Sequence, residues 1–202
     1  MSEVYEMKMN GSIERIHMEY FAVIDTETTW SNEVMSIGVV IAEKSNMLPV
    51  HAECYIIDPA YKEGGMYSSV LGLHGRKNTY LDTRRKCLGA ADRLLKKYKV
   101  KRILAYNASF DKNHLPELGN YIWCDIMKIA AYKQYNKMIP PTVECCSTGK
   151  MKRGYGVEGI LRMIGPDKTY CETHNAYLDA MDELSIVRLL NLELGVYDAA
   201  VL

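Results

Sequence analysis

A short apolar run that ends in two acidic residues constrains this chain more than any other feature. Residues 21–24 read Phe-Ala-Val-Ile, and Asp25 and Glu27 follow directly. An unbroken apolar run of this length indicates a buried central strand. In an extended chain, side chains two positions apart point to the same side, so we expect the two carboxylates to lie close together. A divalent cation such as Mg²⁺ or Mn²⁺ would relieve their repulsion; the alternative is a solvated turn with incidental charges.

A second acid follows another apolar stretch. Residues 102–106 are expected to form a strand, and a helix is expected over residues 108–118, with Asp111 in its first turn. The unpaired N–H groups at a helix N-terminus favour negative charge. Asp111 therefore fits either a simple first-turn charge or a third member of an acidic cluster.

A histidine and a fourth acid stand at the start of the last long helix, which is expected over residues 175–194. On a helical wheel Asp179 falls at the edge of the apolar arc, so its carboxylate is expected at the core boundary. Five residues of helix rotate the chain by about 140° at roughly 3.6 residues per turn, so His174 cannot share that face. We therefore place His174 in the loop that leads into this helix, the entry loop, where its side chain is free to turn toward a metal-bound water.

The remaining pattern predicts a mixed α/β sheet. Strands are expected over residues 34–41 and 50–57, and their short separations from residues 21–24 indicate a three-stranded antiparallel meander. Residues 58–80, rich in Gly, Ser and Tyr, are predicted to be a loop. The later elements are expected to be helices over residues 81–98, 126–135 and 156–164 and a strand over residues 121–124. Together these predict a five-stranded sheet, a meander extended by crossover strands and flanked by helices.

One domain accounts for a chain of 202 residues. Residues 1–19 are interpreted as an N-terminal extension and residues 20–202 as the domain, with an irregular insertion at about residues 136–153. The charged start contains no apolar signal-peptide core, and no stretch approaches the roughly 20 apolar residues of a membrane span. The six cysteines form no C-x-x-C pair and are interpreted as reduced thiols. A cytoplasmic protein without membrane association is therefore expected.

The three acidic stretches together resemble the DEDDh family of 3′-5′ exonucleases, which includes polymerase proofreading subunits, RNase T and oligoribonuclease. The family's D-x-E-T motif is matched within residues 23–28, its N-x-x-F-D motif at residues 107–111 and its H-x-A-x-x-D motif at residues 174–179, in the family's order. The resemblance covers roughly residues 20–192. It implies a ribonuclease H-like fold and a 3′-5′ exonuclease that releases nucleoside 5′-monophosphates from single-stranded DNA or RNA ends.

The resemblance also implies a catalytic role for each acid. In the two-metal mechanism, two Mg²⁺ or Mn²⁺ ions roughly 3.5–4 Å apart clamp the scissile phosphate. Asp25 would bridge both ions, Glu27 and Asp179 would complete the first site, and Asp111 would serve the second. His174 would act as the general base, since a histidine with an ordinary pKa of about 6.5 can accept a proton at neutral pH.

Substrate contacts are expected from residues beside these motifs. Many family members have Gly and then a bulky apolar residue after D-x-E-T, whereas this chain has Thr29 and then Trp30. Trp30 is expected to stack on the terminal base, an interaction of about 1–3 kcal/mol that tolerates any sequence. The alternative is a core residue that anchors the loop. Thr28 and Asn107 are further candidates for substrate binding.

Basic residues must contribute locally, because the 25 basic and 25 acidic residues of the chain cancel. Two basic clusters stand out. One is the insertion cluster of Lys150, Lys152 and Arg153; the other is on the helix predicted over residues 81–98, where Arg84, Arg85 and Lys86 accompany Lys96, Lys97 and Lys99, the three that we call the helix cluster. The insertion cluster lies between the second and third motifs and is expected to reach the cleft. The helix cluster is interpreted as a solvated outer face.

Two other classes of protein compete with an exonuclease. A zinc hydrolase could draw on Cys145, Cys146, Cys171 and His174, but their spacing fits no familiar zinc template and leaves the acids unexplained. An inactive exonuclease-like module could bind nucleic acid or a polymerase, although none of the family's acids is missing.

RNase T-like and oligoribonuclease-like relatives are dimers, so the resemblance leaves a homodimer and a DNA polymerase partner open. It does not separate DNA from RNA as the substrate.

Overall fold

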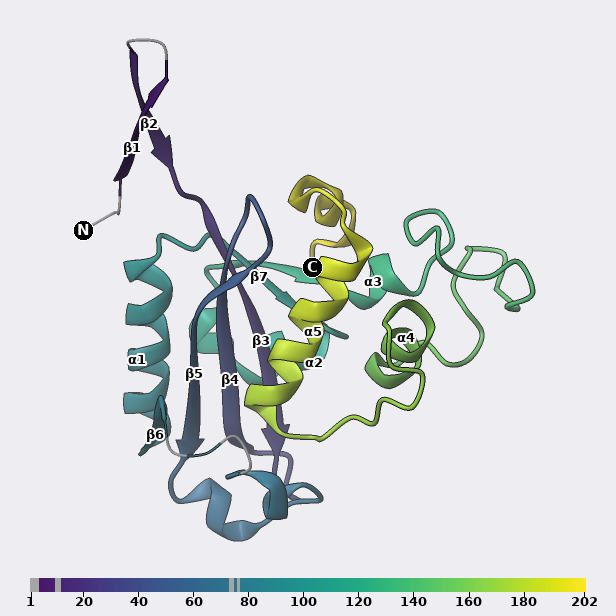
Figure 1. The fold of residues 1–202 in the computed structure, drawn as a ribbon. Coiled ribbons are helices and arrows are strands. Elements are labelled where there is room, and N and C mark those ends of the chain that lie inside the picture. Colours follow the sequence, from purple (N-terminus) through teal and green to yellow (C-terminus); the bar gives the residue numbers. More distant parts are fainter. Residues whose placement is uncertain (1–3, 10–11, 73–74, 76) are drawn as a thin grey trace.

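A six-stranded mixed sheet forms the centre of the molecule, with strand order β6-β5-β4-β3-β7-β8 (Figure 1). The structure is a computed structural model that describes residues 4–9, 12–72, 75 and 77–202, with side chains from Met18 onward. The strands are β3 (Tyr20–Thr28), β4 (Val34–Glu43), β5 (Pro49–Ile57), β6 (Thr79–Asp82), β7 (Arg102–Ala105) and β8 (Ile122–Asp125). Strands β3, β4 and β5 pair antiparallel, and the remaining neighbours pair parallel.

This sheet confirms the predicted mixed α/β architecture, with its antiparallel meander and crossover strands, but it has six strands rather than five. The additional strand is β6, which spans the predicted boundary between the loop over residues 58–80 and the next helix. It is a four-residue edge strand that pairs only with β5. A strand this short shows no apolar alternation that could separate it from a loop.

Helices cover both faces of the sheet (Figure 1). The α-helices are α1 (Arg84–Lys97), α2 (Ser109–His114), α3 (Met127–Ala130), α4 (Val157–Ile164) and α5 (Ala176–Leu190). Among the described residues, four 3₁₀ helices accompany them: η1 (Ala60–Glu63), η2 (Ser68–Val70), η3 (Pro116–Leu118) and η4 (Leu194–Ala200). None of the helices in the described part of the chain is long and apolar enough to cross a membrane.

Four predicted helices are clearly longer than the observed ones. The helix predicted over residues 81–98 is formed by α1 alone, and the one predicted over residues 108–118 is divided into α2 and η3 before Pro116. The helix predicted over residues 126–135 stops at Ala130, because the Asn136 side-chain amide donates to the Ala130 carbonyl at 2.7 Å. The backbone N–H of Met151 donates to the carbonyl of Ala131 at 2.9 Å, so the insertion takes the next acceptor. The last helix ends at Leu190, where Asn191 adopts the left-handed conformation that commonly terminates helices.

Alternation along β3 divides the hydrophobic core into two halves. Phe21 and Val23 pack on the face covered by α4 and α5, and Ala22 and Ile24 pack on the face covered by α1. Because both faces are covered, the strand is apolar at every position from residue 21 to residue 24, as expected for a buried central strand.

The N-terminal residues form a separate hairpin. Strands β1 (Val4–Met9) and β2 (Ser12–His17) pair antiparallel with each other in a two-stranded sheet of their own. The hairpin extends away from the six-stranded sheet (Figure 1). Residues 1–3 and 10–11 of the predicted extension lie outside the described residues, and the division of the chain at residue 20 stays a prediction.

Candidate active site

A close approach between α5 and the sheet brings the start of α5 next to the acids of β3. Gly38 on β4 is in register with Asp25 on β3. A Cβ atom at Gly38 would lie 1.9 Å from the carbonyl oxygen of Ala176, the first residue of α5. Only glycine permits this contact, so the first turns of α5 rest directly on β4 beside Asp25.

The four predicted acids and His174 gather at this contact. Asp25 and Glu27 lie on β3, Asp111 on α2 and Asp179 on α5, and the charges of the other three acids all act on Asp25. One ligand atom from each of Glu27, His174 and Asp179 lies within 4.8 Å of the other two, a spacing that could hold a metal ion.

Asp111 is attached to the first motif by a hydrogen bond. The Thr26 hydroxyl donates to Asp111 Oδ1 at 2.7 Å, and both residues are buried. Asp111 also lies in the first turn of α2, so it occupies the favourable first-turn position that the sequence suggested as the simple alternative. Its contact with β3 adds it to the acidic cluster as well.

Burial and mutual repulsion disfavour negative charge on these acids. Burial is the largest cause in each case, and it raises the pKa of Glu27 to about 8 and the pKa values of Asp111 and Asp179 to about 7. The pKa of Asp25 is also raised well above its ordinary value, first by burial and then by the neighbouring acids. Asp25 Oδ2 and Asp179 Oδ1 are buried and have no hydrogen-bond partner in the described structure.

A further acid, Glu183, belongs to the same cluster and was missed by the sequence interpretation. It lies on α5 one turn after Asp179, is 2% exposed, and acts on Asp25 more strongly than any other acid. The signal was available in the sequence: Glu183 interrupts the apolar arc formed by Ala180 and Leu184. A charged residue at a core position of a helix is rare unless it has a partner.

His174 lies in the entry loop before α5, as expected, and an aromatic ring covers it. Its backbone is left-handed, with φ of 57°, and its ring stacks on Tyr67. The adjacent Asn175 caps α5 by accepting from the Leu178 N–H at 3.2 Å, and its amide donates to the Val70 carbonyl at 2.6 Å. Burial lowers the pKa of His174 below its ordinary value, so the ring is neutral at neutral pH.

Residues 64–71, within the predicted loop, form a bridge between the first and third motifs. The Trp30 N–H donates to the Gly64 carbonyl at 3.2 Å, and a Cβ atom at Gly65 would lie 2.5 Å from the Thr28 carbonyl oxygen. The other end of the bridge contacts the loop before α5 through Tyr67 and Val70. The bridge therefore packs over the end of β3 and the entry to α5.

The candidate substrate-binding residues of the first two motifs lie at the rim of the site. Thr28 is half-buried at the end of β3. Trp30 is 71% exposed, so the interpretation of Trp30 as a core residue is wrong. Asn107 is exposed and left-handed, and its N–H donates to Asp125 Oδ1 at 3.0 Å, which holds the turn between β7 and α2.

The insertion cluster is connected to the site through two tyrosines. The Lys150 ammonium lies 4.3 Å from the centroid of the Tyr155 ring, and the Tyr106 hydroxyl donates to the Tyr155 carbonyl. The backbone of Tyr106 in turn hydrogen bonds to Glu183. Lys152 and Arg153 are exposed and lie 3.6 and 3.9 Å from Glu144.

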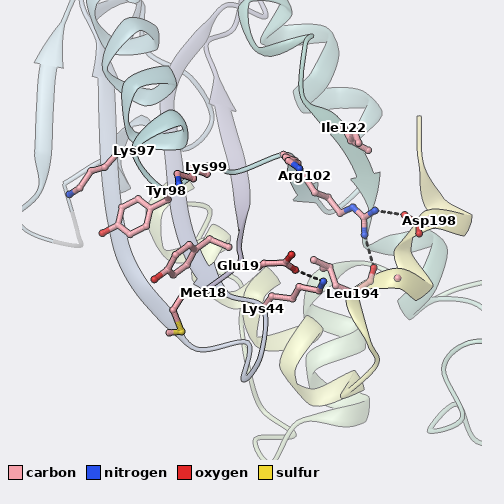
Figure 2. A pocket seen from close by; sticks show the side chains of 13 residues that line it. Met18, Glu19, Lys44, Lys97, Tyr98, Lys99, Arg102, Ile122, Leu194 and Asp198 are labelled. Carbon is pink, nitrogen blue, oxygen red and sulfur yellow. Dashed lines mark hydrogen bonds and ion pairs between the residues drawn. The ribbon is translucent and has the colours of Figure 1, made fainter. Parts of the chain in front are cut away.

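The helix cluster borders a different hollow, a pocket of about 650 Å³ near the starts of β3 and β7 (Figure 2). Lys97, Tyr98 and Lys99 line one side, and Arg102 and Leu194 line the other. None of the five residues predicted to be catalytic lines this pocket. The pocket lies toward the end of the sheet opposite the acids, because β3 and β7 run parallel and the acids follow their C-terminal halves.

The zinc-hydrolase alternative receives no support from the described side chains. The one group of three or more potential metal ligands found among them contains Glu27, His174 and Asp179, without a cysteine. Cys145, Cys146 and Cys171 are free thiols at half-buried or exposed positions. The donor set is therefore mainly carboxylate oxygen, which suits hard cations.

Comparison with solved structures defines the class of fold. No protein-family model matches the sequence, and a search of curated proteins finds no match. The nuclease domain of 3'hExo, a DEDDh family member bound to rAMP, is 14% identical with a TM-score of 0.62, and the match covers 92% of this chain and 97% of that one. A full-length 3'-exonuclease is 16% identical with a TM-score of 0.58, covering 85% and 80% of the two chains.

E. coli Exonuclease I in complex with a dT13 oligonucleotide is 15% identical with a TM-score of 0.57, covering 90% of this chain and 43% of that one. This chain therefore spans less than half of that protein. At such identities the likeness establishes the fold. The chain has the ribonuclease H-like fold of DEDDh exonuclease domains, which confirms at the level of fold the resemblance seen in its motifs.

Proposed function

We propose that this protein is a metal-dependent 3′-5′ exonuclease that releases nucleoside 5′-monophosphates from single-stranded nucleic acid. The proposal rests on one observation: in an exonuclease fold, Asp25, Glu27, Asp111 and Asp179 converge with His174 at a single place. Three separate parts of the chain supply these residues: β3, α2, and the start of α5 with the loop before it. Structural neighbours crystallised with oligonucleotides support single-stranded nucleic acid as the substrate class.

The donor set fits divalent cations. Asp25 Oδ2 and Asp179 Oδ1 are buried without a partner, and the acids around them repel each other. Hard cations in place of protons would give the unpartnered oxygens a partner, and they would relieve the repulsion between the acids. Asp25, Glu27 and Asp179 would hold one Mg²⁺ or Mn²⁺ ion, and Asp25 with Asp111 would hold a second. Two such ions would neutralise charge on the scissile phosphate and would lower the pKa of a bound water.

In this proposal His174 acts as the general base. One of its ring nitrogens lies within 4.8 Å of carboxylate oxygens of Glu27 and Asp179, and the residue precedes the helix, which supports a role in activating a water bound beside these acids. Its lowered pKa leaves the ring nitrogen free to accept a proton from the attacking water at neutral pH. Trp30 and the insertion cluster would hold the terminal base and the phosphates, respectively.

Digestion of matched oligonucleotides tests the proposal. Single-stranded and duplex DNA and RNA, labelled at either end, are incubated with the protein and Mg²⁺ or Mn²⁺. We expect mononucleotide release from the 3′ end of single strands, and full inhibition by a chelator. Release from the 5′ end, or internal cuts, would contradict the proposal. Tight binding without any hydrolysis by wild-type protein would favour the inactive binding module instead.

A further inference from the structure

We propose that Glu183 is a fifth carboxylate of the metal centre, serving the ion held by Asp25 and Asp111. The inference rests on the proposed function and deepens it, because the family motifs account for four acids only. Glu183 follows Asp179 by four residues on α5, so both side chains project from the same face of the helix toward β3. That face lies against β4 at Gly38, directly beside Asp25.

Glu183 lacks the partners that normally accompany a buried carboxylate. It is 2% exposed, and its Oε2 atom has no hydrogen-bond partner in the described structure. The Tyr106 backbone hydrogen bonds to the carboxylate, but the charged groups that act on Glu183 are acids, namely Asp111, Asp179 and Glu172. Buried charges in proteins are usually paired or coordinate metals. Here the neighbouring side chains offer no cation, so a bound cation is the partner that fits.

The six polar residues of the site divide into two groups of three. Glu27, His174 and Asp179 form the first group and bring their ligand atoms within 4.8 Å of one another. Asp25, Asp111 and Glu183 form the second group; their ligand atoms do not all reach that spacing in the described structure, but the charges of Asp111 and Glu183 both act on Asp25. Glu183 is the first acid in order of its effect on Asp25, and Asp111 is the first in order of its effect on Glu183.

Buried oxygens without a hydrogen-bond partner support the second group as a cation site. Two of the buried side-chain oxygens that lack a hydrogen-bond partner in the described structure belong to this group, Asp25 Oδ2 and Glu183 Oε2. A helix that only needed to pack on the sheet would carry an apolar residue at position 183, as it does at Ala180, Leu184 and Val187. The family pattern leaves the second ion with Asp25 and Asp111 alone. Glu183 supplies that ion with a third carboxylate.

Calorimetric titration of the full chain with MnCl₂, without nucleic acid, tests the role of Glu183. Wild-type protein is expected to bind two Mn²⁺ ions. Glu183→Gln keeps the shape of the side chain and removes its charge, and we expect it to weaken one site by roughly tenfold or more while leaving the other in place. Glu183→Asp keeps the charge on a shorter side chain. Its Mn²⁺ affinity at the weakened site is expected to lie between those of wild type and Glu183→Gln. Asp182→Asn is the matched control, since Asp182 is half-buried on the same helix and accepts from the Tyr170 hydroxyl at 2.7 Å.

Thermal melting supplies a second readout that does not depend on turnover. Without metal, Glu183→Gln is expected to melt higher than wild type because repulsion is relieved, and Mn²⁺ is expected to raise its melting temperature by less. Unchanged Mn²⁺ binding in Glu183→Gln would overturn the proposal and leave Glu183 as a protonated core residue. The exonuclease assignment fails separately, if wild-type protein and Asp25→Asn both bind no divalent cation.

Discussion

The imidazole ring of His174 stacks on the phenol ring of Tyr67, with ring centroids 3.9 Å apart and planes 17° from parallel. Tyr67 belongs to the bridge over residues 64–71, which also contacts the turn after β3. The stack therefore joins the predicted general base to the end of the strand that carries Asp25 and Glu27. Because His174 precedes α5 and lies outside the helical hydrogen-bond ladder, this ring contact helps to hold the imidazole in place.

Replacing Tyr67 tests whether the stack positions the histidine. We expect Tyr67→Ala to lower kcat by about tenfold or more with little change in KM, because a misplaced base slows proton transfer without weakening substrate binding. Tyr67→Phe keeps the ring and is expected to retain most of the activity. Tyr61→Ala, a change to a half-buried tyrosine of the neighbouring η1, is the matched control. A faster Tyr67→Ala enzyme would show instead that the ring obstructs the site.

Removing one carboxylate from the cluster should abolish turnover without unfolding the protein. We expect Asp25→Asn and Asp179→Asn to lower kcat by several orders of magnitude, since each change removes a metal ligand. The metal-free variants are expected to melt at or above the wild-type temperature, because four acids repel Asp25 in the folded state. Glu193→Gln, at an exposed position, should match wild type in both assays. Near-wild-type rates in either aspartate variant would contradict the site assignment.

The stability of the metal-free protein should fall as pH rises. The folded pKa of Glu27 is about 8 against an ordinary 4.5, and those of Asp111 and Asp179 are about 7 against 3.8. Between these values the folded chain binds more protons than the unfolded chain, so deprotonation favours unfolding. The stabilisation that these three acids provide by binding protons in the folded state is complete below pH 3.8, and it is lost once pH exceeds 8.

Denaturant unfolding in the presence of a chelator, across the neutral and weakly acidic range, measures this effect. We expect the free energy of unfolding to decrease steadily toward pH 8, with a shallower decrease in Glu27→Gln. Glu33→Gln, at an exposed position near the same strand, should keep the wild-type slope. Added Mg²⁺ should reduce the slope, since the cation replaces the protons. Stability that rises over this range would contradict the repulsive cluster.

Local sequence patterns could predict the strands and the acids attached to them. They could not predict contacts between segments that are distant in the sequence. The run over residues 21–24 revealed β3 because both of its faces are buried. The stack of Tyr67 on His174 left no local signal, since its partners come from separate loops. Glu183 was not predicted for a different reason: a helical wheel treats a glutamate within an apolar arc as an exception, and only its position beside Asp25 in the folded protein explains it.

Trp30 should contribute to substrate affinity without contributing to chemistry. Its ring is exposed beside the end of β3, so it is available to stack on a terminal base. Stacking contributes about 1–3 kcal/mol per base, which corresponds to a KM increase of roughly 5- to 150-fold in Trp30→Ala. Trp30→Phe should restore most of the affinity, and kcat at saturating substrate should change little. A Trp30→Ala variant with wild-type KM for every base would exclude this role.

The two basic clusters should differ in their effect on substrate binding. The insertion cluster is connected to the acids through Tyr155 and Tyr106, and its ion pairs with Glu144 are exposed and therefore weak. The helix cluster stands beside the pocket toward the other end of the sheet (Figure 2). There Lys96 pairs with Asp92 at 2.6 Å. Substrate phosphates near the acids should therefore meet the insertion cluster first.

Neutralising each cluster in turn separates these positions. Each phosphate neutralised by a lysine or arginine contributes about −0.7 to the log–log salt slope for single strands. Replacing Lys150, Lys152 and Arg153 by Gln is therefore expected to raise KM and to flatten the salt dependence by up to about two units, with kcat little changed. The matched triple replacement of Lys96, Lys97 and Lys99 should have a far smaller effect. If the two variants behave alike, or if the helix variant binds more weakly, the substrate path is misplaced, although the roles of the acids would stand.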